Sequence, residues 1–127
     1  MKYLSVKDLI YINEVVVKAG GGSVGVRDLG LIDSAANRSR ATFGGEDLYP
    51  DLFTKAAAMF HSLAFNHAFL DGNKRTAVAA AAQLLYLNGL GLEAPEKELE
   101  DFVVQVVEEH FEIDVIADWL EENSKKR

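Results

Sequence analysis

Nine consecutive residues, His67–Arg75 with the sequence HAFLDGNKR, hold the side chains of this chain that are best suited to catalysis. His67 is the side chain among them that can accept a proton near neutral pH. Asp71 offers hard carboxylate oxygens of the kind that bind Mg²⁺ together with phosphate oxygens. Gly72 allows the backbone to turn tightly and to approach a ligand closely. These residue types predict a loop that handles a phosphate group.

The end of the same stretch favours binding of an anion, because a predicted helix begins at Asn73. Backbone N–H groups at a helix N-terminus bind anions well. Lys74 and Arg75 add cationic donors, and an arginine can bind phosphate oxygens at two points. Phe69 is apolar and is expected to anchor the loop in the core, which fixes the direction of His67. A base, a metal ligand, an anion site and two cations so close together indicate phosphoryl or nucleotidyl transfer.

Taken singly, each of these residues has an ordinary structural explanation. A lone His67 is more simply a histidine that ends a helix and bonds to a carbonyl oxygen. Asp71 with Gly72 is a common turn. Lys74 with Arg75 is a common solvated start of a helix. Their combination at this spacing is the observation that favours chemistry.

Composition and periodicity predict one all-α domain over residues 1–127, a helical bundle of about six helices. Hydrophobic residues make up 49% of the 127-residue chain, and only two prolines occur. Apolar residues recur at helical spacing in the expected segments. The expected helices are a first helix that Ser5 caps and that runs to Lys18, then Leu29–Ser39, Leu52–Asn66 with Asp51 as its cap, Asn73–Asn88, a helix from Pro95 to Val107, and a last helix that Asp114 caps and that frays over Ser124–Arg127.

Two glycine-containing segments separate these helices. The sequence GGGSVG, which begins with Gly20–Gly22, lacks the Lys-Ser/Thr end of a phosphate-binding loop and is interpreted as a flexible turn. The segment Thr42–Pro50 is predicted to be a loop or a short hairpin. The helix Asn73–Asn88 has little side-chain bulk over Ala77–Ala82, so we expect this alanine-rich helix at the centre of the bundle.

The charge and the hydropathy pattern exclude several classes of partner. A net charge of -7 argues against direct binding of nucleic acid, whose affinity comes mainly from phosphate neutralisation. The chain has no cysteine, which excludes disulfides and thiolate metal sites. It has no apolar run of the roughly 18 residues that a membrane helix needs. We therefore expect a soluble, cytoplasmic protein.

The stretch HAFLDGNKR resembles the signature of the Fic/Doc family, His-x-Phe-x-(Asp/Glu/Asn)-(Gly/Ala)-Asn-x-Arg. The resemblance is closest to the death-on-curing (Doc) toxin branch. Chain length, helix order, the glycine-containing segment before the third expected helix and the closing IDVIADWL extend it along the chain. It implies the Fic/Doc fold and an enzyme that transfers part of ATP to a protein hydroxyl, with Mg²⁺ as cofactor.

The resemblance also implies a role for each residue of the motif. His67 would be the general base that deprotonates the target hydroxyl, and Asp71 would hold Mg²⁺. Arg75 would clamp a phosphate and orient ATP, while Phe69 would be structural. The anion hole would consist of Gly72, Asn73 and Lys74, with Asn73 also offering its side-chain amide. A flap that aligns the target peptide would include Phe43, Gly44, Gly45 and Tyr49.

Two positions distinguish the branches of the family. AMP-transferring members usually have Gly where this chain has Lys74, and a second Arg where it has Val78. Both differences match the Doc branch, whose founding toxin transfers the γ-phosphate of ATP to a threonine of elongation factor Tu and stops translation. We therefore expect phosphoryl transfer, with AMP transfer to a protein hydroxyl as one alternative. The other alternative is a catalytically silent binding module that has kept the fold.

Regulation is expected to come from a separate protein. The C-terminal segment Asp118–Asn123, DWLEEN, only partly matches the inhibitory (Ser/Thr)-x-x-x-Glu-(Gly/Asn) motif of self-inhibiting relatives, and an ordinary amphipathic last helix is the simpler interpretation. The Doc branch instead implies an antitoxin whose disordered tail folds on the toxin.

The remaining charged and ring residues are expected to be structural or solvated. His61 is interpreted as a partly buried structural residue and Glu96–Asp101 as an acidic solvated face. Arg38 and Arg40 precede the expected flap, where a surface role is favoured over contact with a phosphate or a partner.

Overall fold

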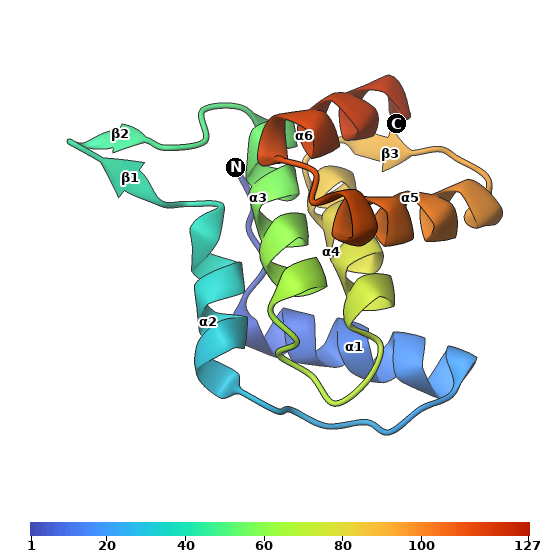
Figure 1. The fold of residues 1–127 in the computed structure, drawn as a ribbon. Helices are drawn as coiled ribbons and strands as arrows, with labels where there is room; N and C mark the ends of the chain where they lie inside the picture. The colour runs from blue at the N-terminus through green and yellow to red at the C-terminus, as the bar shows by residue number, and fades with distance from the viewer.

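The computed structural model describes residues 1–127, and helices account for most of them (Figure 1). The helices are α1 (Val6–Gly20), α2 (Leu29–Arg38), α3 (Leu52–Phe65), α4 (Asn73–Leu87), α5 (Glu96–Glu109) and α6 (Ile113–Glu122). The short strands are β1 (Thr42–Phe43), β2 (Glu46–Asp47), β3 (Leu90–Leu92) and β4 (Ser124–Lys126). The predicted bundle of six helices is confirmed. None of these helices is both long and apolar enough to cross a membrane.

Short polar side chains determine where the first three helices begin. The Ser5 hydroxyl accepts from the Asp8 N–H, and the Asp8 carboxylate accepts from the Ser5 N–H, which is a capping box at α1. Asp28 and Asp51 cap α2 and α3 with their carboxylates. The predicted cap of α6 was wrong: Glu112 is the N-cap, without a side-chain bond, and Asp114 lies in the first turn. A carboxylate there still interacts favourably with the helix dipole.

Helix α4 lies at the centre of the bundle, as the alanine-rich sequence predicts. It packs against α1, α3, α5 and β3 (Figure 1). Ala77, Ala80 and Ala81 are completely buried, and their small size lets neighbouring helices approach closely. Phe60 of α3 and Leu84 of α4 are among the largest side chains that fill the core.

The C-terminus does not fray, contrary to the sequence prediction. Strand β4 pairs antiparallel with β3, with Gly91 opposite Lys125. The Glu93 N–H donates to the Asn123 carbonyl at 2.6 Å, which continues the ladder. Arg127 lies over the ring of Tyr86, 3.9 Å from its centroid. The polar residues of β4 have no strand pattern, and the pairing joins the segment that follows α6 to the segment that follows α4.

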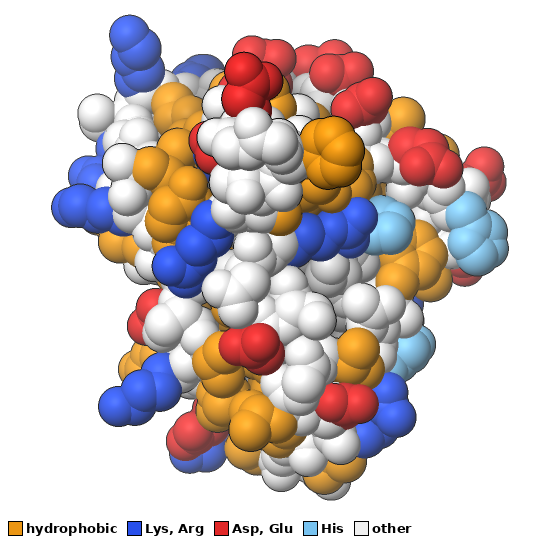
Figure 2. All heavy atoms as spheres, turned by 90° about the vertical axis from the view of Figure 1, so that its left-hand side faces the viewer, with side chains coloured by type: hydrophobic (Ala, Val, Ile, Leu, Met, Phe, Trp, Pro, Cys, Tyr) orange, Lys and Arg blue, Asp and Glu red, His pale blue; other side chains and the backbone are white.

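The segment before α3 forms the short hairpin β1–β2, which projects from the helices (Figure 1). Its turn residues Gly44 and Gly45 have φ values of 62° and 85°, which glycine adopts without strain. Figure 2 views the molecule from the side on which the hairpin projects. Acidic side chains gather toward the top of that view, while Lys and Arg side chains cross its middle and left, so the negative net charge is spread unevenly.

Candidate active site

The motif loop, residues 66–72, connects the end of α3 to the start of α4. His67 directly follows the C-cap Asn66 and has φ 50°, in the left-handed region where glycine is the usual residue after a helix. Arg27 holds this turn, because its guanidinium donates to the carbonyls of Asn66 and His67. The imidazole itself is exposed. His110 ends α5 with a similar φ of 54°, so this conformation is an ordinary helix end, and what distinguishes His67 is its place in the motif beside the start of α4.

The centre of the loop is held in the core. Phe69 is 1% exposed, in agreement with its predicted anchoring role. Its N–H donates to Asn73 Oδ1 and its carbonyl accepts from Asn73 Nδ2, both at 3.0 Å. The Leu70 N–H donates to the Gly25 carbonyl at 3.0 Å, beside a bridge between Val26 and Phe69. Asn73 therefore uses its side chain to close the loop, which leaves its backbone N–H and one amide hydrogen for a ligand.

The N-terminus of α4 is open to an anion. Gly72 occupies the N-cap position with φ 73°, and no side chain caps the helix. The Thr76 N–H is the first that bonds back, to the Gly72 carbonyl at 2.8 Å, so the N–H groups of Asn73, Lys74 and Arg75 have no protein partner. A β-carbon at residue 72 would lie 2.8 Å from Val17 Cγ2. Glycine is therefore required where α4 meets α1.

Asn13 is a positioning residue that the sequence analysis missed. It is 2% exposed, and its Nδ2 donates to the Asp71 carbonyl at 2.9 Å and to Thr76 Oγ1 at 3.0 Å. It therefore links α1 to both the motif loop and α4. Its signal in the sequence was a polar residue on the apolar stripe of α1, midway between the buried Leu9 and Val17.

Two charged residues of the motif, Asp71 and Arg75, contact the end of α1 and the residues just after it. Asp71 Oδ2 accepts from the Ser23 N–H at 2.7 Å, and the remaining oxygen has no partner. Arg75 Nη1 donates to the Val16 carbonyl and Nη2 to the Gly21 carbonyl, each at 3.0 Å. No group of three or more His, Asp or Glu side chains could hold a metal ion. One free carboxylate oxygen still fits Mg²⁺, which commonly binds one carboxylate together with substrate phosphates.

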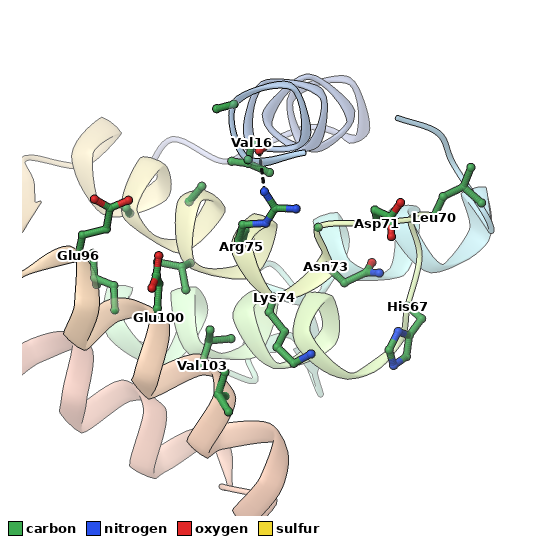
Figure 3. Close-up of a pocket in the computed structure, with 18 residues that line it drawn as sticks. Val16, His67, Leu70, Asp71, Asn73, Lys74, Arg75, Glu96, Glu100 and Val103 are labelled. Carbon is green, nitrogen blue, oxygen red and sulfur yellow. Dashed lines mark hydrogen bonds between the residues drawn. The ribbon is translucent and has the colours of Figure 1, made fainter. Parts of the chain in front are cut away.

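A cleft of about 900 Å³ lies beside the motif, between α1, α4 and α5 (Figure 3). His67, Asn73 and Lys74 line one end. Glu96 and Glu100 of α5 also line the cleft, so the expected acidic solvated face is in part a wall of the site. The apolar lining comes from Val16, Ala19, Leu70, Val78, Ala79, Ala82, Leu99, Val103 and Val104. The cleft therefore combines a cationic end and an acidic wall with an apolar floor.

The predicted flap residues do not line this cleft. The hairpin precedes α3 and the motif loop follows it, so the 14-residue helix separates their bases by about 21 Å. Phe43 is 82% exposed near the hairpin turn. Tyr49 lies at the hairpin base, where its hydroxyl accepts from Arg38 Nε at 3.3 Å. The structure thus brings the motif residues together and leaves the flap residues apart from them.

Arg38 is not the surface residue that the sequence favoured. Its Nη1 lies 2.9 Å from Ser62 Oγ and 3.2 Å from His61 Nδ1, so it ties α2 to α3. Burial lowers the pKa of His61, and the adjacent Arg38 charge lowers it further. His61 is partly buried, as expected. Arg40 is exposed and lies over the ring of Tyr3.

The C-terminal segment Asp118–Asn123 does not reach the cleft. Its residues belong to the end of α6, and none of them lines the cleft. Trp119 stacks on Phe102 with ring centroids 4.0 Å apart, and Leu120 is buried. This geometry agrees with an ordinary amphipathic last helix.

Comparisons with known proteins agree with the motif and the fold. The model of the Fic/DOC family matches residues 3–85, which include the motif loop and most of α4. The chain is 44% identical over 118 residues to the protein named Toxin Doc of Mycolicibacterium smegmatis, an alignment that covers 91% of this chain and 88% of the relative. It is 31% identical over 121 residues to the Protein kinase doc of Escherichia phage P1, with 94% of each chain covered. The chain belongs to the Fic/Doc family.

Proposed function

We propose that this protein is a Doc-type toxin that transfers a phosphoryl group from ATP to a hydroxyl of a target protein. The observation that carries the proposal is the uncapped N-terminus of α4, which lies with Lys74 and the exposed His67 at one end of a single cleft. The names of the two relatives, a Doc toxin and a Doc protein kinase, support the same function.

The geometry suits a different role for each of the motif residues. His67 accepts the proton of the target hydroxyl, whose oxygen bonds to the γ-phosphorus of ATP while the bond from that phosphorus to the bridging oxygen breaks and ADP leaves. The free N–H groups at the start of α4, together with Lys74, bind phosphate oxygens. Arg75 keeps three of its five N–H donors free for a further phosphate oxygen. Asp71 would hold Mg²⁺ through its unpaired oxygen, and the ion would supply positive charge beside the phosphates.

Phosphoryl transfer is favoured over AMP transfer by the charge distribution of the cleft. The cations Lys74 and Arg75 both belong to the first turn of α4, and the next turn contributes the apolar Val78. The opposite wall carries Glu96 and Glu100, which repel phosphate. Phosphate binding is therefore confined to a short region beside His67. A compact cationic site is better suited to activate one terminal phosphate than to bind a polyphosphate chain along α4.

The partners follow from the same family membership. The target to test is elongation factor Tu, which the resemblance to the Doc branch implies, and its modification would inhibit translation. A toxin also requires an antitoxin, which we propose is a small protein whose disordered tail folds on this chain. The flap residues Phe43, Gly44, Gly45 and Tyr49 would contact the target protein, which is large enough to reach both ends of α3.

The test uses the intact protein, purified elongation factor Tu and ATP labelled at either the γ- or the α-phosphate. The proposal expects γ-label on the target, with no transfer by His67→Ala. Label from the α-phosphate would instead identify an AMP transferase. Absence of transfer from either position, with no growth defect when the protein is expressed alone, would identify a silent binding module. A short neighbouring gene that encodes a DNA-binding segment and a polar tail would support the antitoxin.

A further inference from the structure

The segment Gly20–Ser23, called the glycine loop from here on, ends α1 and contacts Asp71 and Arg75 of the motif. The sequence favoured a flexible turn, but the loop carries specific contacts to Asp71 and Arg75. We propose that the glycine loop is a positioning element of the active site, which sets the direction of the metal-binding carboxylate and of the phosphate-binding guanidinium. The inference rests on the proposed function of these two residues.

Gly20 leaves the space that the Arg75 guanidinium occupies. A β-carbon at residue 20 would overlap Arg75 Nη1 and would lie 3.0 Å from its Cζ. In that position the guanidinium donates to the carbonyls of Val16 and Gly21, at the end of α1 where the helix dipole is negative. These two bonds hold the plane of the guanidinium and leave other N–H groups free. The absence of a side chain at residue 20 is thus what allows Arg75 to lie against α1.

Gly22 and Ser23 hold Asp71 in a comparable way. Gly22 has φ 115°, and a β-carbon there would lie 3.0 Å from Asp71 Cβ and 3.2 Å from Asp71 Oδ2. The next N–H, from Ser23, donates to the same oxygen at 2.7 Å. The carboxylate therefore has one oxygen fixed by the backbone and the other free for a cation. A hydrogen bond of this kind orients a metal ligand, and its loss commonly weakens metal binding.

Two glycines with positive φ provide a matched pair of variants. Gly22 and Gly89 have φ values of 115° and 92°, so replacement by alanine strains the backbone at either position. Only a β-carbon at residue 22 would meet Asp71, because nothing lies within 4 Å of one at residue 89, which lies beyond the far end of α4. We expect Gly22→Ala to weaken binding of Mn²⁺ with ATP by roughly tenfold, and Gly89→Ala to leave it nearly unchanged.

The measurement is the affinity for Mn²⁺ with ATP by electron paramagnetic resonance, followed by KM and kcat for the transfer reaction. Gly22→Ala should raise KM for the metal–nucleotide complex about as much as it weakens Mn²⁺ binding. An equal loss of affinity in Gly89→Ala and Gly22→Ala would mean that the substitution at residue 22 acts only through stability. Unchanged affinity in both variants would also overturn the proposal.

A second experiment tests the contact between Gly20 and Arg75 without any activity. Alanine is more favourable than glycine in a helix, so Gly20→Ala at the end of α1 would ordinarily raise the melting temperature. The overlap with Arg75 predicts the opposite, a fall of about 3–5 °C. In an Arg75→Ala background the same change should raise the melting temperature, because the obstructing side chain is gone. Gly91→Ala in β3, where a β-carbon makes only ordinary contact, serves as a remote control.

The two experiments distinguish a wrong inference about the glycine loop from a wrong proposed function. A rise in melting temperature for Gly20→Ala in both backgrounds would show that Arg75 does not depend on the space at residue 20, and would overturn the inference. If the unaltered protein binds Mn²⁺ with ATP but transfers nothing, the proposed reaction fails while the binding and melting measurements still test the loop.

Discussion

The two segments that flank α3 differ sharply in how firmly they are held. After α3, the motif loop has Phe69 in the core and bonds to Asn13 of α1, to Arg27 and to Asn73 of α4. Before α3, the hairpin residues 42–48 are all exposed. The hairpin is anchored only at its base, where buried Lys55 donates to Asp47 Oδ2 at 3.1 Å and to the Ser39 carbonyl at 3.2 Å.

Under the proposed function, this difference would separate the catalytic motif from the surface that recognises the target. A reacting histidine and a phosphate site require fixed geometry, because small displacements of catalytic groups reduce rates strongly. A surface that contacts a protein target tolerates movement and benefits from exposed apolar side chains such as Phe43. The contrast predicts that changes at the motif affect turnover or folding, whereas changes at the hairpin affect affinity for the target.

The largest expected effect is that of His67→Ala. Removal of a general base lowers kcat by about 10²–10⁴-fold, while the exposed position leaves the fold intact. Transfer of γ-label measures the rate, and thermal unfolding checks the fold. Retention of more than about a tenth of the rate would be inconsistent with His67 as the base.

Phe69→Ala tests the claim that the motif loop is part of the core. Truncation of a fully buried phenylalanine costs about 3–5 kcal/mol of unfolding free energy. Urea denaturation measures this loss. A cost below about 1 kcal/mol would mean that the loop is not anchored in the core, and the contrast between the two segments would disappear.

Asn13→Leu tests the link between α1 and the motif. The leucine has a similar size but leaves the Asp71 carbonyl and Thr76 Oγ1 without their donor, which costs about 1–3 kcal/mol. We expect a fall in kcat as well, since the loop loses one of its restraints. Urea denaturation and γ-label transfer report the two effects, and Asn37→Leu on the exposed side of α2 is the control. Equal kcat values in the two variants would argue against a positioning role for Asn13.

Lys55→Met should loosen the base of the hairpin without touching the motif. The buried ammonium group is lost, so Asp47 and the Ser39 carbonyl lose their donor. We expect KM for the target protein to rise about tenfold, because binding must then order the hairpin. Affinity for Mn²⁺ with ATP should stay the same. A lower kcat with unchanged KM would place Lys55 with the motif instead of the hairpin.

Phe43→Ala should have the smallest effect on stability. A side chain that is 82% exposed contributes less than about 0.5 kcal/mol to folding. If the hairpin contacts the target, KM for the target should still rise, by up to about tenfold for an aromatic contact residue. Urea denaturation and steady-state kinetics measure the two quantities. Unchanged KM would remove Phe43 from the target surface.

The parts of the fold that could be predicted depend on neighbours in the sequence. Ser5, Asp28 and Asp51 cap helices through bonds to residues three positions ahead, and Gly44 with Gly45 makes a turn through its own backbone angles. The wrong predictions concern distant neighbours. Strand β4 pairs with a strand more than thirty residues earlier in the chain, and nothing in its polar sequence indicates that partner.

The sequence by itself determined the family, the helix order and the chemical nature of the site, because nine adjacent residues carry the motif. The tertiary structure decided which hydrogen-bonding atoms of those residues have partners within the protein and which remain available to a ligand. The partners of Asp71 and Arg75 lie 48 to 59 positions away in the chain, in or just after α1. Such contacts depend on how α1 packs against α4, which no local pattern encodes. The same packing explains why the glycine loop is more than the flexible turn that the sequence predicts: its backbone contacts Asp71 and Arg75.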